Sequence, residues 1–386
     1  MIIAGVQESR SDPAYRADHI GSLLRPQEIL DARSNPRTTP DELRAIEDRH
    51  IVRVLQRQKD LGFHVLTDGE LRRRGFMSDF YESIDGLDTD GSVARAWKGT
   101  GDRGSGIGGQ LGASVSPLTG IVIDRIRQRK RLTKHEVDFL VRHSPGDIKM
   151  TLPSANQFPA VMYRKGLSDK AYPTYSDFLR DVVPIIKAEI QALLTEGVKY
   201  IQIDAPRYSY YLDPKWREFI RTEMGVTPEH ALDEAIRVDN ACLEGARREG
   251  VVLAIHLCRG NNRSQWYAEG GYDPIAEKLF NQLDVDLFLL EYESERAGTF
   301  EPLRFVPSDK AVVLGLVSSK VPALESPDEL HRRIKEASRY VPLERLALSP
   351  QCGFASVLEG NLLTEDDQWQ KLKLVVDTAR RVWKDA

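Results

Sequence analysis

His256 and Cys258, two residues of types that bind transition metals, stand two positions apart in the chain. A short apolar run over residues 251–255 precedes them and predicts a buried strand. Because side chains i and i+2 of an extended chain point to the same side, the imidazole and the thiol are expected side by side at the end of that strand. A lone His or Cys in such a place is often structural, so the pair by itself indicates half of a metal site.

Two later strand ends supply further ligands of the right kinds. Glu291 follows the apolar run 285–290, and Cys352 follows the run 345–348. Glu293 and Glu295 compete for the carboxylate position, but the strand boundary favours Glu291. Zinc favours four ligands drawn from His, Cys and carboxylate, whereas magnesium and calcium prefer oxygen.

The expected ligand set predicts a particular chemistry for the metal. Two thiolates place negative charge on zinc and make it a mild Lewis acid. Such a centre is better suited to binding and ionising a substrate thiol than to activating water, because a bound cation lowers the pKa of the thiol.

Composition excludes several classes of function. The chain has 386 residues, 41% of them hydrophobic, which is enough for a large core. A net charge of −4, evenly mixed, predicts no binding of nucleic acid or of an anionic membrane, and no apolar run is long enough to span a bilayer. Three cysteines without a disulfide pattern, and an N-terminus without the features of a signal peptide, predict a cytoplasmic protein.

Short apolar runs alternate with amphipathic stretches along the chain, a pattern typical of a parallel α/β sheet. Eight strands are expected, over residues 15–22, 63–67, 147–152, 200–204, 251–255, 285–290, 311–316 and 345–348. The long helices between them are expected over residues 40–61, 175–195 and 228–248, from 327 onward, and over 365–383. Eight such units predict a (β/α)8 TIM barrel, with an open doubly wound sheet as the alternative.

The polar residues follow the expected strand ends, where the active site of a barrel lies. They are Ser22, Glu70, Asp204, His256, Cys258, Glu291, Ser318 and Cys352. Residues 84–145 interrupt the alternation, with crowded glycines and a strand pair expected within 115–123. We therefore interpret residues 1–386 as a single barrel with 84–145 as an insertion after the second strand, a hairpin excursion over the site.

Several segments resemble the cobalamin-independent methionine synthase family, and its short, single-barrel members in particular. They lie at residues 18–26, 67–70, 256–261, 290–292, 315–320 and 349–356, where the chain reads DHIGSLLRP, TDGE, HLCRGN, LEY, GLVSSK and SPQCGFAS. The resemblance covers most of the chain outside residues 84–145. It implies a zinc-containing barrel that alkylates a thiol.

The resemblance also implies a role for individual residues. The zinc ligands of the family fall on His256, Cys258, Glu291 and Cys352. Its amino-acid-binding positions fall on Ile20, Gly21, Ser22, Glu70 and Asp204. The two acids would hold the ammonium group of homocysteine, and the backbone near Ser22 would hold its carboxylate. The reaction implied is methyl transfer to homocysteine, giving methionine.

The chain departs from the full-length synthase in three ways. It has no room for the second barrel. The Asp-Glu-Pro signature reads Asp204-Ala205-Pro206, so one acid is missing. The histidine that moves a proton to the folate leaving group falls at Val317 or Ser318, which leaves Ser318 as the candidate catalytic residue without an imidazole. Another methylated compound or a corrinoid protein is therefore open as the methyl donor, and so is a homo-oligomeric state.

Two other functions stay open at this point. Epoxyalkane:coenzyme M transferases resemble the chain in the same segments and form or cleave a thioether with a thiol that carries a sulfonate. In such an enzyme, basic residues that bind the sulfonate should replace the two acids that would bind an ammonium group. Five arginines near the expected site are available: Arg72, Arg73, Arg74, Arg259 and Arg263. The other function is a zinc-stabilised or thiol-sensing binding protein without catalysis.

Overall fold

The computed structural model describes residues 13, 15–91, 95, 96, 98, 113, 114 and 120–384. The helices are α1 (Gln27–Ser34), α2 (Pro40–Leu61), α3 (Ser78–Tyr81), α4 (Lys134–His143), α5 (Phe158–Met162), α6 (Tyr175–Thr195), α7 (Pro214–Glu223), α8 (Pro228–Leu243), α9 (Ala276–Gln282), α10 (Pro327–Ala337) and α11 (Glu365–Val382). The strands are β1 (Val65–Leu66), β2 (Ile84–Asp88), β3 (Arg95–Ala96), β4 (Ala113–Ser114), β5 (Ile121–Gln128), β6 (Asp147–Pro153), β7 (Tyr200–Asp204), β8 (Val252–Leu257), β9 (Leu287–Glu291), β10 (Ala311–Val317) and β11 (Leu346–Pro350).

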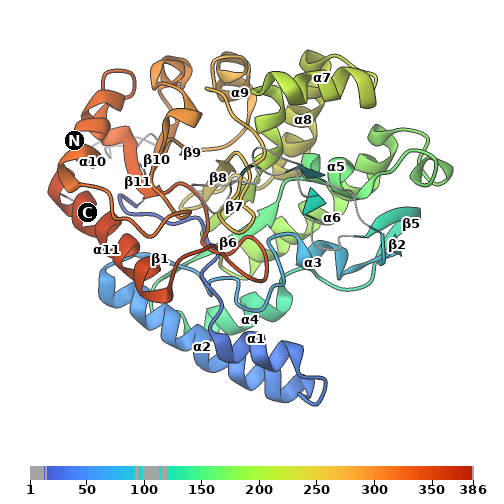
Figure 1. Cartoon of the computed structure of the whole chain (residues 1–386), viewed down its shortest axis with the longest axis horizontal. Coiled ribbons are helices and arrows are strands. Elements are labelled where there is room, and N and C mark those ends of the chain that lie inside the picture. Colours follow the sequence, from blue (N-terminus) through green and yellow to red (C-terminus); the bar gives the residue numbers. More distant parts are fainter. Residues whose placement is uncertain are drawn as a thin grey trace, which may run out of the picture.

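A parallel seven-stranded sheet forms the centre of the molecule, in the order β1-β6-β7-β8-β9-β10-β11. The order follows the chain without reversal, so the sheet lacks the switch point of a doubly wound fold. It curls, and the long helices lie around it (Figure 1). Each of these strands coincides with one of the expected apolar runs, so the prediction of a parallel α/β sheet is confirmed.

The interior of the curl is filled by side chains. Alternate strand residues form a small apolar cluster of their own, separate from the main core between sheet and helices. Its members are Ile20, Val65, Tyr200, Ala254, Leu287, Leu289, Ala311, Val313 and Ala347. The sheet therefore packs on both faces, with helices outside and its own side chains inside.

The segment expected as the first strand pairs with the last strand at one point. Ala17 forms a parallel bridge with Leu348. The Asp18 N–H donates to the Leu348 carbonyl, and the Leu348 N–H donates to the Arg16 carbonyl, each at 2.9 Å. Beyond this bridge the segment is held by side chains. Asp18 accepts hydrogen bonds from Lys149 Nζ at 2.8 Å and from the Tyr200 hydroxyl at 2.7 Å. These contacts turn the chain into the curl, so a regular strand over 15–22 is not formed.

Helix boundaries follow local capping chemistry. Thr39 accepts from the N–H of Glu42 and completes a capping box ahead of Pro40, so α2 begins there. Thr174 and Thr364 do the same for α6 and α11. α8 ends at Leu243, earlier than expected, because Gly245 adopts a left-handed conformation with φ 75°.

The described part of the predicted insertion contains more than a hairpin. β2 pairs antiparallel with β5, and β3 with β4, whereas residues 115–119 and the glycines at 104–109 lie outside the described residues. The backbone of Lys98 pairs with Trp266 in the loop after β8. α4 contacts β6, so the last part of the 84–145 interval packs with the central sheet. Within the described residues, no helix is long and apolar enough to cross a membrane.

Candidate active site

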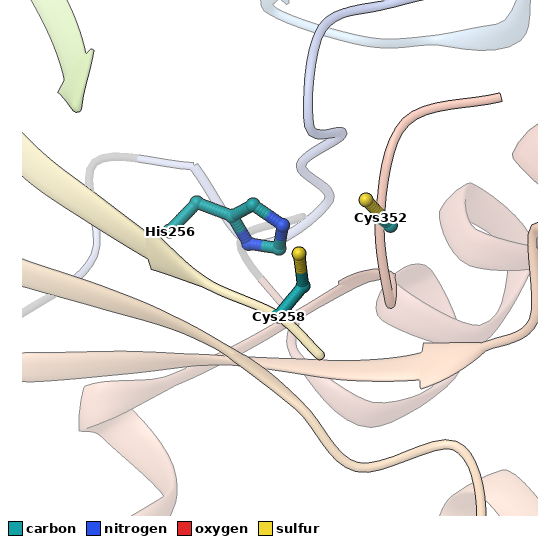
Figure 2. A group of neighbouring side chains, drawn as sticks. All are labelled: His256, Cys258 and Cys352. Atoms are coloured by element: carbon teal, nitrogen blue, oxygen red, sulfur yellow. The ribbon is translucent and has the colours of Figure 1, made fainter. Parts of the chain in front are cut away.

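Two strand ends bring together three side chains of the predicted metal set. His256 is near the end of β8, Cys258 follows that strand, and Cys352 follows β11. Their ligand atoms all lie within 4.8 Å of one another, and all three side chains are buried. Figure 2 shows the imidazole and the two sulfur atoms facing a common point. The structure thus brings these three predicted residues together.

The orientation of His256 leaves one ring nitrogen available to a metal. Nδ1 lies 3.2 Å from the carbonyl oxygen of Leu289, which suits an N–H donor on that nitrogen. Nε2 is buried and has no hydrogen-bond partner. Burying an imidazole nitrogen without a hydrogen-bond partner costs free energy, and a coordinated metal would supply the missing partner. The donor set of one nitrogen and two sulfurs therefore fits zinc.

The two thiols stand in different electrostatic positions. A hydrogen bond from Cys258, together with contact with His256, holds the pKa of the Cys352 thiol well below its usual range. The same sulfur–sulfur contact and burial raise the pKa of Cys258. Burial lowers the pKa of His256, but the contact with Cys352 outweighs it and leaves the pKa raised. One negative charge is thus favoured among the three groups, and a cation bound there would stabilise it.

Glu291 lies beside this group but is not part of it. Its carboxylate is fully buried and accepts hydrogen bonds from the Arg259 N–H at 2.8 Å and from Arg296 Nη2 at 2.8 Å. Burial would raise its pKa, but Arg296 and Arg259 hold it below the usual range. The metal group within the described residues therefore consists of His256, Cys258 and Cys352.

Glu70 is held in place at the end of the loop after β1. Its backbone has φ 55°, a left-handed conformation that is rare for residues other than glycine. Oε1 accepts from the Thr151 hydroxyl at 2.8 Å and lies 3.8 Å from Arg73 Nη1, whereas Oε2 is buried without a partner. Burial raises the pKa of this carboxyl against the opposing effect of Arg73. The free oxygen is available to a cationic ligand.

Asp204 ends β7 and lies on the same side of the sheet. Its Oδ1 accepts from Gln202 Nε2 at 2.7 Å, and this amide also donates to the Ile20 carbonyl at 2.7 Å. Burial raises the pKa of Asp204 to about 7, with the nearby charge of Glu70 adding to the effect. A ligand ammonium group would reverse this shift, because it stabilises both carboxylates.

The backbone between Ile20 and Ser22 lies close to both acids. Gly21 has φ 130°, and a β-carbon there would lie 3.0 Å from Glu70 Oε1. A β-carbon on Gly353 would lie 2.0 Å from the Ser22 hydroxyl, which in turn accepts from the Ala355 N–H at 3.3 Å. Both glycines are thus required by close backbone approach. They let the loop of residues 20–22 and the loop after β11 meet beside the metal group.

A buried guanidinium ties three of these loops together. Arg25 donates to the carbonyl oxygens of Arg73, Ala355, Val357 and Glu70, at 2.8 to 3.3 Å. Burial lowers its pKa to about 10. Arg25 thus positions Glu70 relative to the loop that carries Cys352.

These groups share one cavity, with about 840 Å³ of space between atoms including its mouth. Its lining includes the predicted residues Ile20, Ser22, Glu70, Asp204, His256, Cys258 and Cys352. It also includes residues that sequence reasoning missed, among them Phe76, Met77, Tyr81, Gln157, Val161, Asn261, Ser356 and Val357. They carry no chemical signature, and only their position in the loops and short helices that follow the strands could have indicated them. The aromatic residue Tyr267 also lines the cavity, whereas Tyr208, Tyr210, Trp266 and Phe354 are not among its lining residues.

Ser318 and the five arginines do not line the cavity. Ser318 shapes its own turn, with its hydroxyl accepting from the Lys320 N–H at 3.2 Å and its N–H donating to Glu325. Arg72 pairs with Glu47 and Asp48, and Arg73 with Asp79 and Glu136. Arg259 is buried, and its guanidinium donates to Tyr272 and to backbone carbonyls, while Arg74 and Arg263 are exposed.

A second group of potential metal ligands, Asp79, His135 and Glu136, lies beyond Glu70. Arg73 occupies its centre. It contacts Asp79 at 2.6 Å and forms two hydrogen bonds, of 2.8 and 2.7 Å, with Glu136. The guanidinium already pairs with both acids, so this group is an ion-pair network that supports Glu70.

Asp68 gives the site a measurable dependence on pH. Burial raises its pKa to about 7, and its Oδ2 atom has no partner. Because the pKa in an unfolded chain is about 3.9, the folded state holds the proton more tightly, and the free energy of unfolding falls as pH rises from about 4 to about 7. We expect Asp68→Asn, which cannot ionise, to match the wild type near pH 4 and to exceed its free energy of unfolding at pH 8 by about 1–3 kcal/mol.

Urea denaturation at the two pH values measures this effect. An amide oxygen can keep the hydrogen bond that Asp68 Oδ1 accepts from the Glu70 N–H at 2.9 Å. Asp366→Asn, the same change at an exposed helix position, is the control and should show no such difference. An equal gain in the free energy of unfolding at both pH values would contradict the raised pKa of Asp68.

Comparison with known proteins places this site in a family. The family model described as "Cobalamin-independent synthase, Catalytic domain" matches residues 171–381. The chain is 39% identical to protein YxjG of Bacillus subtilis, over 97% of this chain and 96% of that protein. The chain belongs to the cobalamin-independent methionine synthase family.

Other members of the cobalamin-independent methionine synthase family match almost from end to end. A methionine synthase of Saccharolobus solfataricus is 25% identical over 94% of this chain and 93% of its own. The crystal structure of a candidate vitamin-B12-independent methionine synthase from Listeria monocytogenes superposes with a TM-score of 0.67 at 29% identity, covering 95% of this chain and 98% of that one. The family model includes Asp204 and the His256, Cys258 and Cys352 group, whereas Ile20 to Glu70 precede it.

Proposed function

We propose that this protein is a zinc-dependent methyltransferase that converts homocysteine to methionine. One observation carries the proposal: a single cavity is lined both by the His256, Cys258 and Cys352 group and by the two acids Glu70 and Asp204. Residues that can bind a metal and residues that can bind an ammonium group, in one cavity, fit a substrate that has both a thiol and an amino group.

His256, Cys258 and Cys352 would hold the zinc ion. Zinc at this site would lower the pKa of the substrate thiol and so supply a nucleophile near neutral pH. Glu291 is proposed as the fourth protein ligand. To serve in that role, its carboxylate has to leave the hydrogen bonds with Arg296 and Arg259.

The other residues of the cavity would bind and orient the amino acid. The unpartnered Oε2 of Glu70 and the carboxylate of Asp204 would accept hydrogen bonds from the ammonium group. The backbone of Ile20, Gly21 and Ser22 would face the substrate carboxylate. Thr151, Arg73 and Gln202 hold the two acids, so the substrate meets a site that is already oriented.

The charge of the cavity favours an amino-acid thiol over a thiol that carries a sulfonate. Among the described residues, the lining contains Glu70 and Asp204 and no arginine or lysine. A sulfonate would face two buried acids without a compensating cation, which is unfavourable. This observation supports homocysteine and counts against an epoxyalkane:coenzyme M transferase.

We also propose that residues 15–22 close the curled sheet into a (β/α)8 barrel. The Ala17–Leu348 bridge on one side, the hydrogen bond from the Leu23 N–H to the Gly69 carbonyl on the other, and the place of Ile20 in the interior cluster support this closure. A closed barrel would bring the first and last loops together around the site. The location in the cytoplasm stays a prediction, supported by three free, buried cysteines.

Binding of homocysteine to the metal centre tests the proposed function directly. Cobalt(II) in place of zinc makes thiolate ligation visible, and we expect the sulfur-to-cobalt absorption to rise when homocysteine is added. 4-Mercaptobutyrate, which lacks the ammonium group, should require a higher concentration for the same change. Absence of any spectral response to homocysteine would refute the proposal.

A further inference from the structure

One part of the cavity lining, which we call the donor half, contains no charged residue and no metal ligand. Its side chains are aromatic, aliphatic or thioether: Phe76, Met77, Tyr81, Val161, Tyr267 and Val357. The backbone bridge between Gly75 and Val357, with the Phe76 N–H donating to the Ser356 carbonyl at 3.2 Å, holds two of these walls together. The residues of the donor half line the same cavity as Cys258 and Cys352, so a methyl donor bound against them would share that cavity with the metal group.

Among the described residues of the cavity lining, no histidine outside the metal group and no carboxyl outside the two acids is offered to a leaving group. All eight histidines of the chain lie in the described part, and His256 alone lines the cavity, as a member of the metal group. The Tyr267 hydroxyl already donates to the Pro206 carbonyl at 2.9 Å, and burial raises the pKa of the Tyr81 phenol and so makes it a weaker proton donor. Glu70 and Asp204 are engaged by the ammonium group under the proposed function. A methylated amine or folate nitrogen, which must be protonated as it leaves, is poorly served here.

The charge and surface of the cavity favour a cation. Among the described lining residues the only formal charges outside the metal group are the two acids, and no lysine or arginine opposes a positive ligand. Aromatic faces attract cations that carry methyl groups, and thioether sulfur is polarizable. Phe76, Tyr81 and Tyr267 supply such rings in the donor half.

We propose that the methyl donor is a small alkyl sulfonium ion that binds in the pocket formed by Phe76, Met77, Tyr81, Val161, Tyr267 and Val357. The homocysteine thiolate attacks the methyl carbon, a carbon–sulfur bond forms to give methionine, and the bond to the sulfonium sulfur breaks. The bonding electrons go to that sulfur, and a neutral thioether departs. No proton is required, so this transfer needs no acid beyond those of the described lining. The inference rests on the proposed function and specifies its donor.

Isotope transfer tests the inference. Zinc-loaded protein, homocysteine and trimethylsulfonium with deuterated methyl groups should give trideuterated methionine and dimethyl sulfide, detected by mass spectrometry. We expect kcat/KM with this donor to exceed that with 5-methyltetrahydrofolate or methylcobalamin by about tenfold or more. No transfer from the sulfonium, or faster transfer from the folate or the corrinoid, would overturn the inference.

Variants test the pocket itself. Phe76→Leu removes a ring from the donor half and should raise KM for trimethylsulfonium about threefold to tenfold, the usual value of a cation–aromatic contact. Phe219→Leu is the matched control, because Phe219 is also half-buried but packs on Tyr210 and Trp216 outside the cavity. Equal effects of the two changes would overturn the assignment of the pocket.

Binding without turnover separates the two proposals. In metal-free protein, the methyl NMR signal of trimethylsulfonium should broaden, whereas that of tert-butanol, a neutral molecule of similar shape, should not. Loss of this selectivity would overturn the sulfonium inference. If homocysteine still perturbs the cobalt spectrum, the proposed function survives that failure; if it does not, the proposed function fails as well.

Discussion

Cys352→Ala should leave a protein that folds but no longer retains zinc or transfers a methyl group. Its sulfur is one of the three ligand atoms within 4.8 Å of one another, and it is the thiol whose pKa is held lowest, by Cys258 and His256. Removing a thiolate ligand should weaken zinc binding by about 100-fold or more, because structural zinc sites derive their binding free energy from a few such ligands. His256→Ala should have the same effect. Metal analysis after dialysis, with circular dichroism to confirm folding, measures both.

Cys242 provides the matched control. It is also buried and free, but it lies in α8 among core residues, with its sulfur 4.0 Å from the Val183 carbonyl. Cys242→Ala should therefore keep its zinc and its activity. Full zinc content in Cys352→Ala and His256→Ala would show that the metal is held elsewhere or is not bound at all.

Glu70→Gln should impair recognition of the amino group while leaving the metal in place. The carboxylate has one oxygen bound to Thr151 and one buried oxygen without a partner, so the amide keeps its shape but loses the charge. Losing a charge-assisted hydrogen bond costs about 1.5–3 kcal/mol, so KM for homocysteine should rise about 10- to 100-fold. Steady-state kinetics with saturating methyl donor gives this value.

A substrate analogue shows whether the charge acts on the ammonium group. The wild type should prefer homocysteine to 4-mercaptobutyrate, and Glu70→Gln should lose most of that preference. Glu359→Gln, the same change at an exposed position two residues from Val357 of the cavity wall, should change neither value. If Glu70→Gln discriminated between the two thiols as well as the wild type does, the acid would have another role.

The sequence was most informative where local chemistry and periodicity agree. The runs ending at Asp204, Leu257 and Glu291 are apolar, short and bounded by turn residues, so both their strands and the side of the sheet reached by the following residues could be predicted. His256, Cys258 and Cys352 could be grouped because residues after parallel strands converge at one end of a sheet.

Other features depend on contacts between distant residues. The first segment, 15–22, reads as a strand, yet Lys149 and Tyr200 bind Asp18 and turn the chain inward. Glu291 has the right position for a metal ligand, but Arg296, five residues later, competes for its carboxylate. The donor half of the cavity consists of ordinary apolar residues such as Phe76, Met77 and Val161, which sequence alone cannot distinguish from core.

The pairing of Ala17 with Leu348 bears on how the protein is made. A ribosome adds about 5–20 residues per second, and the first segment therefore waits for roughly a quarter of a minute to a minute before its partner exists. During that time the nascent chain carries His256 and Cys258, then Glu291, but lacks Cys352 and the loop that meets Ser22. The complete binding centre can form only after translation has nearly ended, so truncated chains should lack it. Under the proposed function, capture of zinc would be a late event in biogenesis.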